Sequence, residues 1–281
     1  NFDTYLKFQE VKFALNKGVN DGFIRYGQLA QEIIDMEPES VVGYRILGWY
    51  NYFTAKDYRN PLDERREALS KASKLSQKAL SIDDSDASSY VLLGNIYLLK
   101  RQYEKAIQAG EQAVKLEPNG AMTHGLFGRI LSYADRPDQA IEHLEKGIRL
   151  DPFPDFYMYI DLGRSYIIKE NYEKALSVIQ KSIQLAPENP MPYYLLGVTY
   201  VKLDRATEAN ETIKKLMELS PKTSLNAVSK SPFKNKGHLE LITDALRKAG
   251  LPEKPPIPLP NKPSIAVLPF DNMSDDPQQE Y

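Results

Sequence analysis

The chain has 281 residues, of which 42% are hydrophobic and 26% are charged, an ordinary composition for a folded protein. Its 36 basic and 38 acidic residues give a formal net charge of −2, which lacks the positive excess typical of a nucleic-acid-binding protein. The chain has no cysteine for disulfides or thiolate sites, and no apolar run approaches the roughly 18 residues of a membrane span, so we expect no membrane insertion. It begins at Asn1 without a signal pattern, from which we expect a processed product or a fragment of a longer protein.

The first 86 residues are predicted to form two helix hairpins of irregular sequence. Residues 1–40 contain two helical patterns that end at Pro38, and residues 41–86 contain the stretch YRILGWY around Gly48. Ala72, the counterpart in the second helix, follows Gly48 by 24 residues, whereas the later copies use 12. About a dozen residues near KDYRNPLDERRE are therefore inserted, as a longer helix or a loop.

Four regular hairpins are predicted over residues 87–120, 121–155, 156–189 and 190–222, because three marks recur together at intervals of 34, 35 and 34 residues. A glycine and an alanine where two helices cross would let their backbones approach closely, and a proline would end the second helix. The marks are Gly94, Gly128, Gly163 and Gly197; Ala106, Ala140, Ala175 and Ala209; and Pro118, Pro152, Pro187 and Pro221.

Apolar residues one before and three after each glycine share one helical face, which a single hairpin cannot bury alone. Each hairpin must therefore stack on its neighbours. The layout resembles the tetratricopeptide repeat (TPR) family. That resemblance implies an all-α, right-handed superhelix of about six hairpins over residues 1–222, with a helix at 238–250 that caps the open end, so the array spans residues 1–250.

Two segments of different composition follow the array. Residues 251–263 contain six prolines in thirteen residues, which predicts an extended spacer of ~3.1 Å per residue. Residues 264–281 begin with SIAVLPF, which is apolar on both faces and predicts an orphan β-strand in an otherwise helical chain. The tail at 251–281 also supports a hypothesis of self-association, by docking in a groove or by pairing with the same strand of a second chain.

The sequence KPSIAVLPFDNMSDDPQQEY (262–281) resembles the opening strand and turn of the TolB-like α/β domain of bacterial signalling proteins. In such proteins this domain accompanies a TPR array and either a class III nucleotide cyclase domain or a winged-helix DNA-binding domain. The resemblance implies a truncated TolB-like start at 264–281. The order differs, because in those relatives the TolB-like domain precedes the array, whereas its first strand follows the array here.

Residues that could carry catalysis do not converge in the sequence. His124, His143 and His238 fall on different predicted helices without the i, i+4 spacing of a metal site, so each is predicted to be a surface or packing residue. DDSD (83–86) lacks the glycine and glutamate of a calcium loop and is interpreted as a helix N-cap. We expect no catalytic residue, no metal and no cofactor in these 281 residues.

The TPR resemblance places the first helix of each hairpin along a concave groove. Positions three before and one, four and five after each glycine are predicted to face it, and they are rich in the aromatic and arginine side chains that anchor interfaces. The expected ligand is a peptide or protein segment with apolar side chains and an acidic group, and the alternative for each aromatic residue is packing between hairpins. The candidates are Arg45, Trp49, Tyr52, Phe53, Asn95, Leu98, Leu99, Arg129, Tyr133, Arg164, Ile168, Tyr194 and Val198.

Three hypotheses for function remain open. The leading one is a non-catalytic, protein-binding scaffold within a larger bacterial signalling protein. The alternatives are a regulatory region of a class III adenylate or guanylate cyclase and a sensory region of a winged-helix transcription regulator. Chaperone-binding TPR domains grip a C-terminal carboxylate with Lys and Asn residues. Here only Asn95, Arg129 and Arg164 resemble that set, which argues against a chaperone-tail ligand.

Overall fold

The structure is a computed structural model that describes residues 6–7, 9–10, 21–57 and 60–255. Its described part is helical and contains no strand, in agreement with the all-α prediction. The predicted strand within 264–281, and the predicted linker beyond residue 255, lie outside the described residues. The helices are α2 (Asp21–Met36), α3 (Val41–Lys56), α4 (Leu62–Ile82), α5 (Ala87–Leu99), α6 (Tyr103–Leu116), α7 (Ala121–Tyr133), α8 (Pro137–Leu150), α9 (Phe156–Ile168), α10 (Tyr172–Leu185), α11 (Met191–Lys202), α12 (Ala206–Leu219), α13 (Leu225–Val228) and α14 (Lys236–Lys248).

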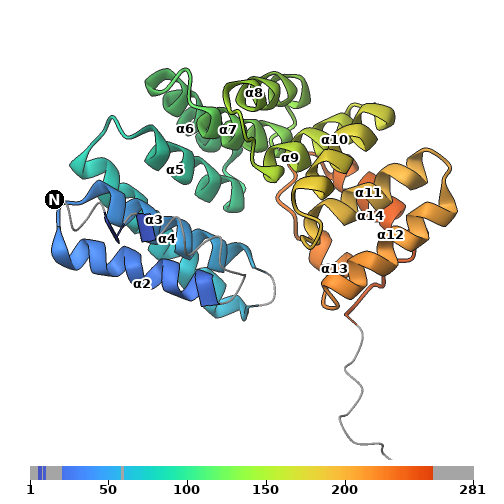
Figure 1. Ribbon diagram of the computed structural model, residues 1–281, viewed down its shortest axis with the longest axis horizontal. Coiled ribbons are helices and arrows are strands. Elements are labelled where there is room, and N and C mark those ends of the chain that lie inside the picture. The colour runs from blue at the N-terminus through green and yellow to red at the C-terminus, as the bar shows by residue number, and fades with distance from the viewer. Residues whose placement is uncertain (1–5, 8, 11–20, 58–59, 256–281) are drawn as a thin grey trace, which may run out of the picture.

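Helices α3 to α12 form consecutive hairpins that follow one another along an arc (Figure 1). The first helix of each hairpin packs on its own partner and on the first helix of the next hairpin. Figure 1 shows α5, α7 and α9 along the inner side of the arc and α6, α8 and α10 along its outer side. The inner side, built from first helices, is called the inner face below. Helix α14 packs on α11 and so covers the C-terminal end of the series.

The repeated glycines lie where the two helices of a hairpin come closest. A Cβ atom at Gly128 would lie 2.5 Å from Leu144 Cγ and 3.1 Å from the Ala140 carbonyl oxygen. A Cβ atom at Gly163 would lie 2.5 Å from Ile179 Cγ1. The four repeated alanines are completely buried. The close helix approach predicted from the repeat is therefore confirmed, because a larger side chain would force the helices apart.

The turn inside each regular hairpin contains a non-glycine residue with positive φ. The φ values are 56° at Arg101, 66° at Asp135, 56° at Glu170 and 58° at Asp204. The next residue donates its N–H to the carbonyl five residues back, as from Gln102 to Tyr97 at 2.9 Å. This Schellman-type bond satisfies carbonyls at the helix end and offsets the cost of the left-handed conformation. These turns could not be predicted from the sequence, because none of the four positions is a glycine.

The insertion in the second hairpin takes the form of longer helices. Helix α4 has 21 residues, whereas the second helices of the later hairpins have 14. Helix α3 continues from Gly48 to Lys56, whereas α5 ends at Leu99, only five residues after Gly94. The extra turn of α3 carries the register of the inner face on to Lys56.

The C-terminal end of the described chain folds back on the array. The segment 229–235 between α13 and α14, called the strap, reaches the turns of the third and fourth hairpins, where the Lys234 N–H donates to the Tyr133 carbonyl at 2.9 Å. Leu251 is buried, and the N–H groups of Leu225 and Asn226 donate to the carbonyls of Pro252 and Glu253. The folded unit thus extends past the predicted array boundary at residue 250. No helix in the described part combines the length and apolarity that crossing a membrane requires.

Candidate partner-binding face

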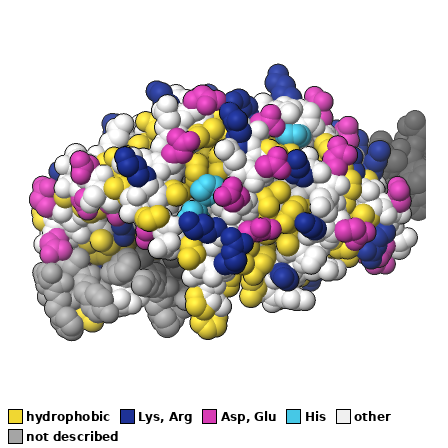
Figure 2. All heavy atoms as spheres, turned by 90° about the horizontal axis from the view of Figure 1, so that it is seen from above, with side chains coloured by type: hydrophobic (Ala, Val, Ile, Leu, Met, Phe, Trp, Pro, Cys, Tyr) yellow, Lys and Arg dark blue, Asp and Glu magenta, His cyan; other side chains and the backbone are white. Residues whose placement is uncertain are grey.

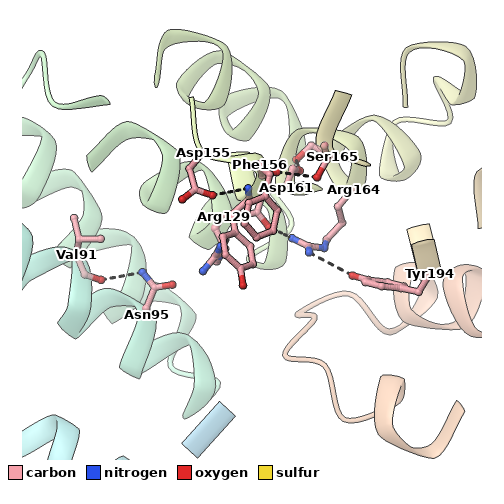
Figure 3. A network of polar contacts seen from close by, with 11 residues as sticks. Val91, Asn95, Arg129, Asp155, Phe156, Asp161, Arg164, Ser165 and Tyr194 are labelled. Carbon is pink, nitrogen blue, oxygen red and sulfur yellow. Dashed lines mark hydrogen bonds and ion pairs between the residues drawn. The ribbon is translucent and has the colours of Figure 1, made fainter. Parts of the chain in front are cut away.

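A buried charge network lies at the centre of the inner face, on α7 and α9 (Figure 3). Arg129 Nε donates to Asp161 Oδ2 at 2.8 Å, and Arg164 Nη1 donates to Asp161 Oδ1. Each arginine follows its repeat glycine by one residue, so the repeat itself places the two on neighbouring first helices. Burial disfavours the charge of Asp161, but the two guanidinium groups outweigh it and hold its pKa below the ordinary value.

Tyrosine rings line both arginines. The Arg164 Cζ atom lies 4.4 Å from the centre of the Tyr133 ring, and Nη2 donates to the Tyr194 hydroxyl at 3.4 Å. Arg129 Cζ lies 5.6 Å from the centre of the Tyr157 ring. Such cation–π contacts hold each planar guanidinium in one orientation, which preorganises the network.

A third cation, Lys56 at the end of α3, lies close enough to this network to interact with its charges. Burial, supplemented by the positive charges of Arg129 and Arg164, lowers the pKa of Lys56 to about 7, and Asp161 only partly opposes the shift. Arg129 and Arg164 are therefore both paired with one carboxylate, and the charge of Lys56 is coupled to the same group. The network is charge-imbalanced, with two positive charges in excess when Lys56 is protonated and one when it is neutral.

Several buried polar atoms on the inner helices have no hydrogen-bond partner among the described residues. Arg164 Nε, Asn95 Oδ1 and Ser132 Oγ are buried and unpaired, although the Asn95 amide donates to the Val91 carbonyl at 2.9 Å. All three residues occupy positions one or four after a repeat glycine. Buried polar groups are nearly always paired in folded proteins, so an unpaired set on neighbouring inner helices is unusual.

The strap is a non-helical segment that already packs beside this network. Phe233, which is 5% exposed, meets the Tyr133 ring edge-on with centroids 4.8 Å apart. The Arg101 guanidinium donates to the carbonyls of Lys230, Ser231 and Phe233 at 3.2–3.3 Å. The C-terminal end of the array is therefore tied to the third and fourth hairpins, and Tyr133 is held between the strap and Arg164.

The structure separates the predicted groove residues into three groups. Arg129, Tyr133, Arg164 and Tyr194 meet in the network described above. Trp49, Tyr52 and Phe53 form an aromatic cluster on α3, with ring centroids 5.3–5.6 Å apart, in which Phe53 is the most exposed at 36%. The remaining candidates serve mainly packing or a structural ion pair.

That third group is explained by the close stacking of first helices. Asn95, Leu98 and Val198 have at most 1% of their surface exposed, Ile168 has 9%, and Leu99 is half-buried. Arg45 Nη1 pairs with Asp86 Oδ1 at 2.5 Å, at the N-cap of α5. The expectation that these side chains line an open groove is corrected, because neighbouring helices cover them. They pack between the helices, beneath the surface of the inner face.

Comparison with known families agrees with this repeat architecture. A family profile described as "Anaphase-promoting complex, cyclosome, subunit 3" matches residues 65–147, and two profiles described as "Tetratricopeptide repeat" match residues 126–190 and 192–223. The chain is a TPR protein. As a TPR fold it belongs to a class of protein-interaction scaffolds.

Solved TPR structures share the fold at low identity. The hetero-tetramer Cut9-Hcn1 of the APC/C is 17% identical with a TM-score of 0.58, and the match covers 79% of this chain and 45% of that one. PilW, a "widely conserved type IV pilus biogenesis factor", is 15% identical with a TM-score of 0.54, covering 72% and 90%. A thermophilic TPR protein of Thermus thermophilus is 12% identical with a TM-score of 0.53, covering 74% and 99%.

One curated relative matches over a short stretch. The protein named "Putative adenylate cyclase 3" of Rhizobium meliloti (strain 1021) is 75% identical over 28 residues, which are 10% of this chain. The match spans 5% of that relative's length.

The charge network and its lining contain three residues that were not predicted from the sequence. Asp161 is acidic like the residues of the outer faces, but its i, i+3 spacing to Arg164 is a signal for a pair on one face. Tyr157 lies outside the glycine-based register. Lys56 follows Gly48 by eight residues, so it joins the inner-face positions only because the inserted residues extend α3 by one more turn.

The histidines are packing residues, but two of them are neighbours. His124 Nδ1 and His143 Nδ1 lie 2.7 Å apart, and His124 Nε2 lies 3.0 Å from the Pro118 carbonyl. A carbonyl only accepts, so neutral His124 carries its proton on Nε2 and accepts from His143 Nδ1–H. Burial lowers the pKa of both rings, which favours this neutral pair. The described residues contain no group of three or more potential metal ligands.

The outer side of the TPR array has a different character. Figure 2 views the molecule from above Figure 1, and lysine and arginine side chains alternate there with aspartate and glutamate. A hollow of about 310 Å³ between α6, α7 and α8 is lined by Glu111, Lys115 and His143 among others. It contains no residue of the charge network.

Proposed function

We propose that the inner face of this TPR array binds an extended segment of a partner protein, and that the array acts as a non-catalytic scaffold. The observation that carries the proposal is the pair of tyrosine-lined arginines, Arg129 and Arg164, on one face of the described chain, where Arg164 Nε has no hydrogen-bond partner among the described residues. Aromatic and arginine side chains are the types that concentrate binding energy at interfaces.

The strap provides an internal example of such binding. It is a non-helical segment whose backbone carbonyls accept hydrogen bonds from Arg101 and whose Phe233 ring packs on Tyr133. A partner segment would use the same interactions on the neighbouring part of the face. Backbone hydrogen bonds would contribute affinity, and the aromatic pockets would contribute specificity.

The proposal is tested by selection from a library of random twelve-residue peptides, with the array as bait. Phe53→Glu places a carboxylate among the inner-face aromatics, and Phe153→Glu makes the same change at a ring that is 90% exposed in the α8–α9 connection. We expect recovered peptides to lose binding to the Phe53 variant and keep it for the Phe153 variant. A selection that recovers nothing, or peptides indifferent to both changes, would reject the proposal.

A second candidate is that the array belongs to the regulatory region of a nucleotide cyclase. The 28-residue match to the Rhizobium meliloti protein favours it. The test is a cyclase assay of the full-length protein, before and after addition of a selected peptide. A peptide-dependent change in cyclic nucleotide production would support a regulatory role, and a protein without cyclase activity would exclude it.

A further inference from the structure

We propose that the charge network of Lys56, Arg129, Arg164 and Asp161 is an anion-binding site, which holds a side-chain carboxylate of the segment bound to the inner face. This inference rests on the proposed function, which it deepens by assigning the ligand's chemistry.

Charge balance gives the first argument. Among the described residues, Asp161 is the carboxylate that acts on all three cations of the network, and it already bridges Arg129 and Arg164. Buried cations are costly unless each has a counter-charge. With Lys56 neutral, the network therefore has one negative charge too few in the unbound protein, and a single carboxylate from a ligand would supply it.

Unused hydrogen-bond donors give the second argument. Arg164 is 1% exposed, and its Nε–H has no partner among the described residues. Arg129 binds Asp161 through Nε alone, and its two terminal nitrogens make no hydrogen bond to the described part of the chain. A guanidinium fork matches the two oxygens of a carboxylate, so the free edge of Arg129 is suited to bind one.

The position of Lys56 gives the third argument. The inserted turn of α3 ends at Lys56, where burial and the positive charges of Arg129 and Arg164 both lower the pKa of the ammonium. An apolar side chain at this position would pack without the cost of a buried charge. Strongly perturbed titratable groups at a concave face are typical of functional sites, where stability is exchanged for binding.

A bound carboxylate would favour the protonated form of Lys56. At pH 8 a lysine with a pKa of about 7 is mostly neutral, and a neighbouring negative charge raises that pKa. Binding of an acidic segment should therefore take up a proton, up to about one per complex. Binding of an apolar segment should not, which separates the two modes.

The experiment uses the peptides recovered in the selection, synthesised with acetylated and amidated ends so that no terminal carboxylate is present. Each is compared with its Glu→Gln or Asp→Asn counterpart by calorimetry at pH 8, in Tris and in HEPES buffers, against wild-type protein and Lys56→Met. We expect the acidic peptide to bind wild type about 10-fold or more tightly than its amide counterpart, the loss typical of one charge-assisted hydrogen bond. We also expect proton uptake with wild type and its absence with Lys56→Met.

The Lys56→Met variant retains both arginines and Asp161, so it should fold, and the acidic-to-amide affinity ratio should shrink in it. Arg129→Gln, with Arg164 still paired to Asp161, is a second variant expected to reduce the same ratio. Equal binding of acidic and amide peptides, or equal proton uptake by wild type and Lys56→Met, would overturn the anion site. Peptides that fail on Phe53→Glu yet tolerate Glu→Gln would leave the proposed function standing and reject only this inference.

Discussion

Replacing Lys56 with methionine is expected to stabilise the array, and most strongly at neutral or acidic pH. Methionine keeps the length of the side chain and favours helix, but it removes the ammonium that burial, Arg129 and Arg164 disfavour. The change therefore relieves an electrostatic cost without opening a cavity.

The magnitude follows from the pKa of Lys56, which falls from 10.5 to about 7 on folding. Each pKa unit is worth about 1.4 kcal/mol, so the full shift corresponds to roughly 4–5 kcal/mol. Partial solvent access, and a favourable effect of about 0.3–1 kcal/mol for a cation at a helix C-terminus, reduce the expected gain to about 2–3 kcal/mol.

The pH dependence has a definite sign. The folded pKa lies below the unfolded one, so the folded protein binds fewer protons between about pH 7 and pH 10.5. The penalty is complete below pH 7 and fades as the pH rises through that window. The advantage of the Lys56→Met variant should therefore be largest at pH 6.5 and smaller at pH 9.5.

Urea denaturation of both proteins at pH 6.5 and pH 9.5 measures this difference, because urea does not screen charges. Lys202→Met is the matched control, since Lys202 ends the first helix α11 as Lys56 ends α3 but lies exposed, away from the network. The reasoning is refuted if Lys56→Met is no more stable than wild type at pH 6.5. It is also refuted if the substitution changes the free energy of unfolding equally at both pH values.

Three further predictions concern other parts of the chain. Phe233→Ala should cost about 3 kcal/mol and speed amide exchange at Lys234, because it removes the buried anchor of the strap; the exposed Phe153→Ala is the control, and an unchanged Lys234 amide would contradict it. The His124–His143 pair should make the array lose stability as the pH falls below 6.5, because both folded pKa values are lowered; His143→Phe should reduce that loss in thermal melts at pH 7.5 and 5, and an identical loss would exclude the pair as its cause. Truncation after Lys254 should convert any dimer seen by light scattering into a monomer if residues 255–281 drive self-association, whereas a dimer that persists would reject that hypothesis. The cut is made there because a cut after Gly250 would also remove buried Leu251.

The repeat architecture could be predicted because its signals are local and periodic. Gly128 and Ala140 recur at the same place in every regular repeat, and only a small side chain at Gly128 leaves room for Leu144 and the Ala140 carbonyl. The arginines at Arg129 and Arg164 could be placed on the inner face for the same reason. The helical turns at Arg101 and Asp135 escaped prediction, because a left-handed residue other than glycine leaves no mark in the sequence.

The sequence by itself determined the four regular hairpins and the small residues at their helix crossings, because both depend on spacings that recur along the chain. Only the tertiary structure decided which charged groups meet. Lys56 and Arg164 lie 108 positions apart in the sequence, and the strap reaches Arg101 across about 130 residues. Those encounters depend on the accumulated curvature of the superhelix, which sums small rotations over several hairpins and has no counterpart in any short stretch of sequence.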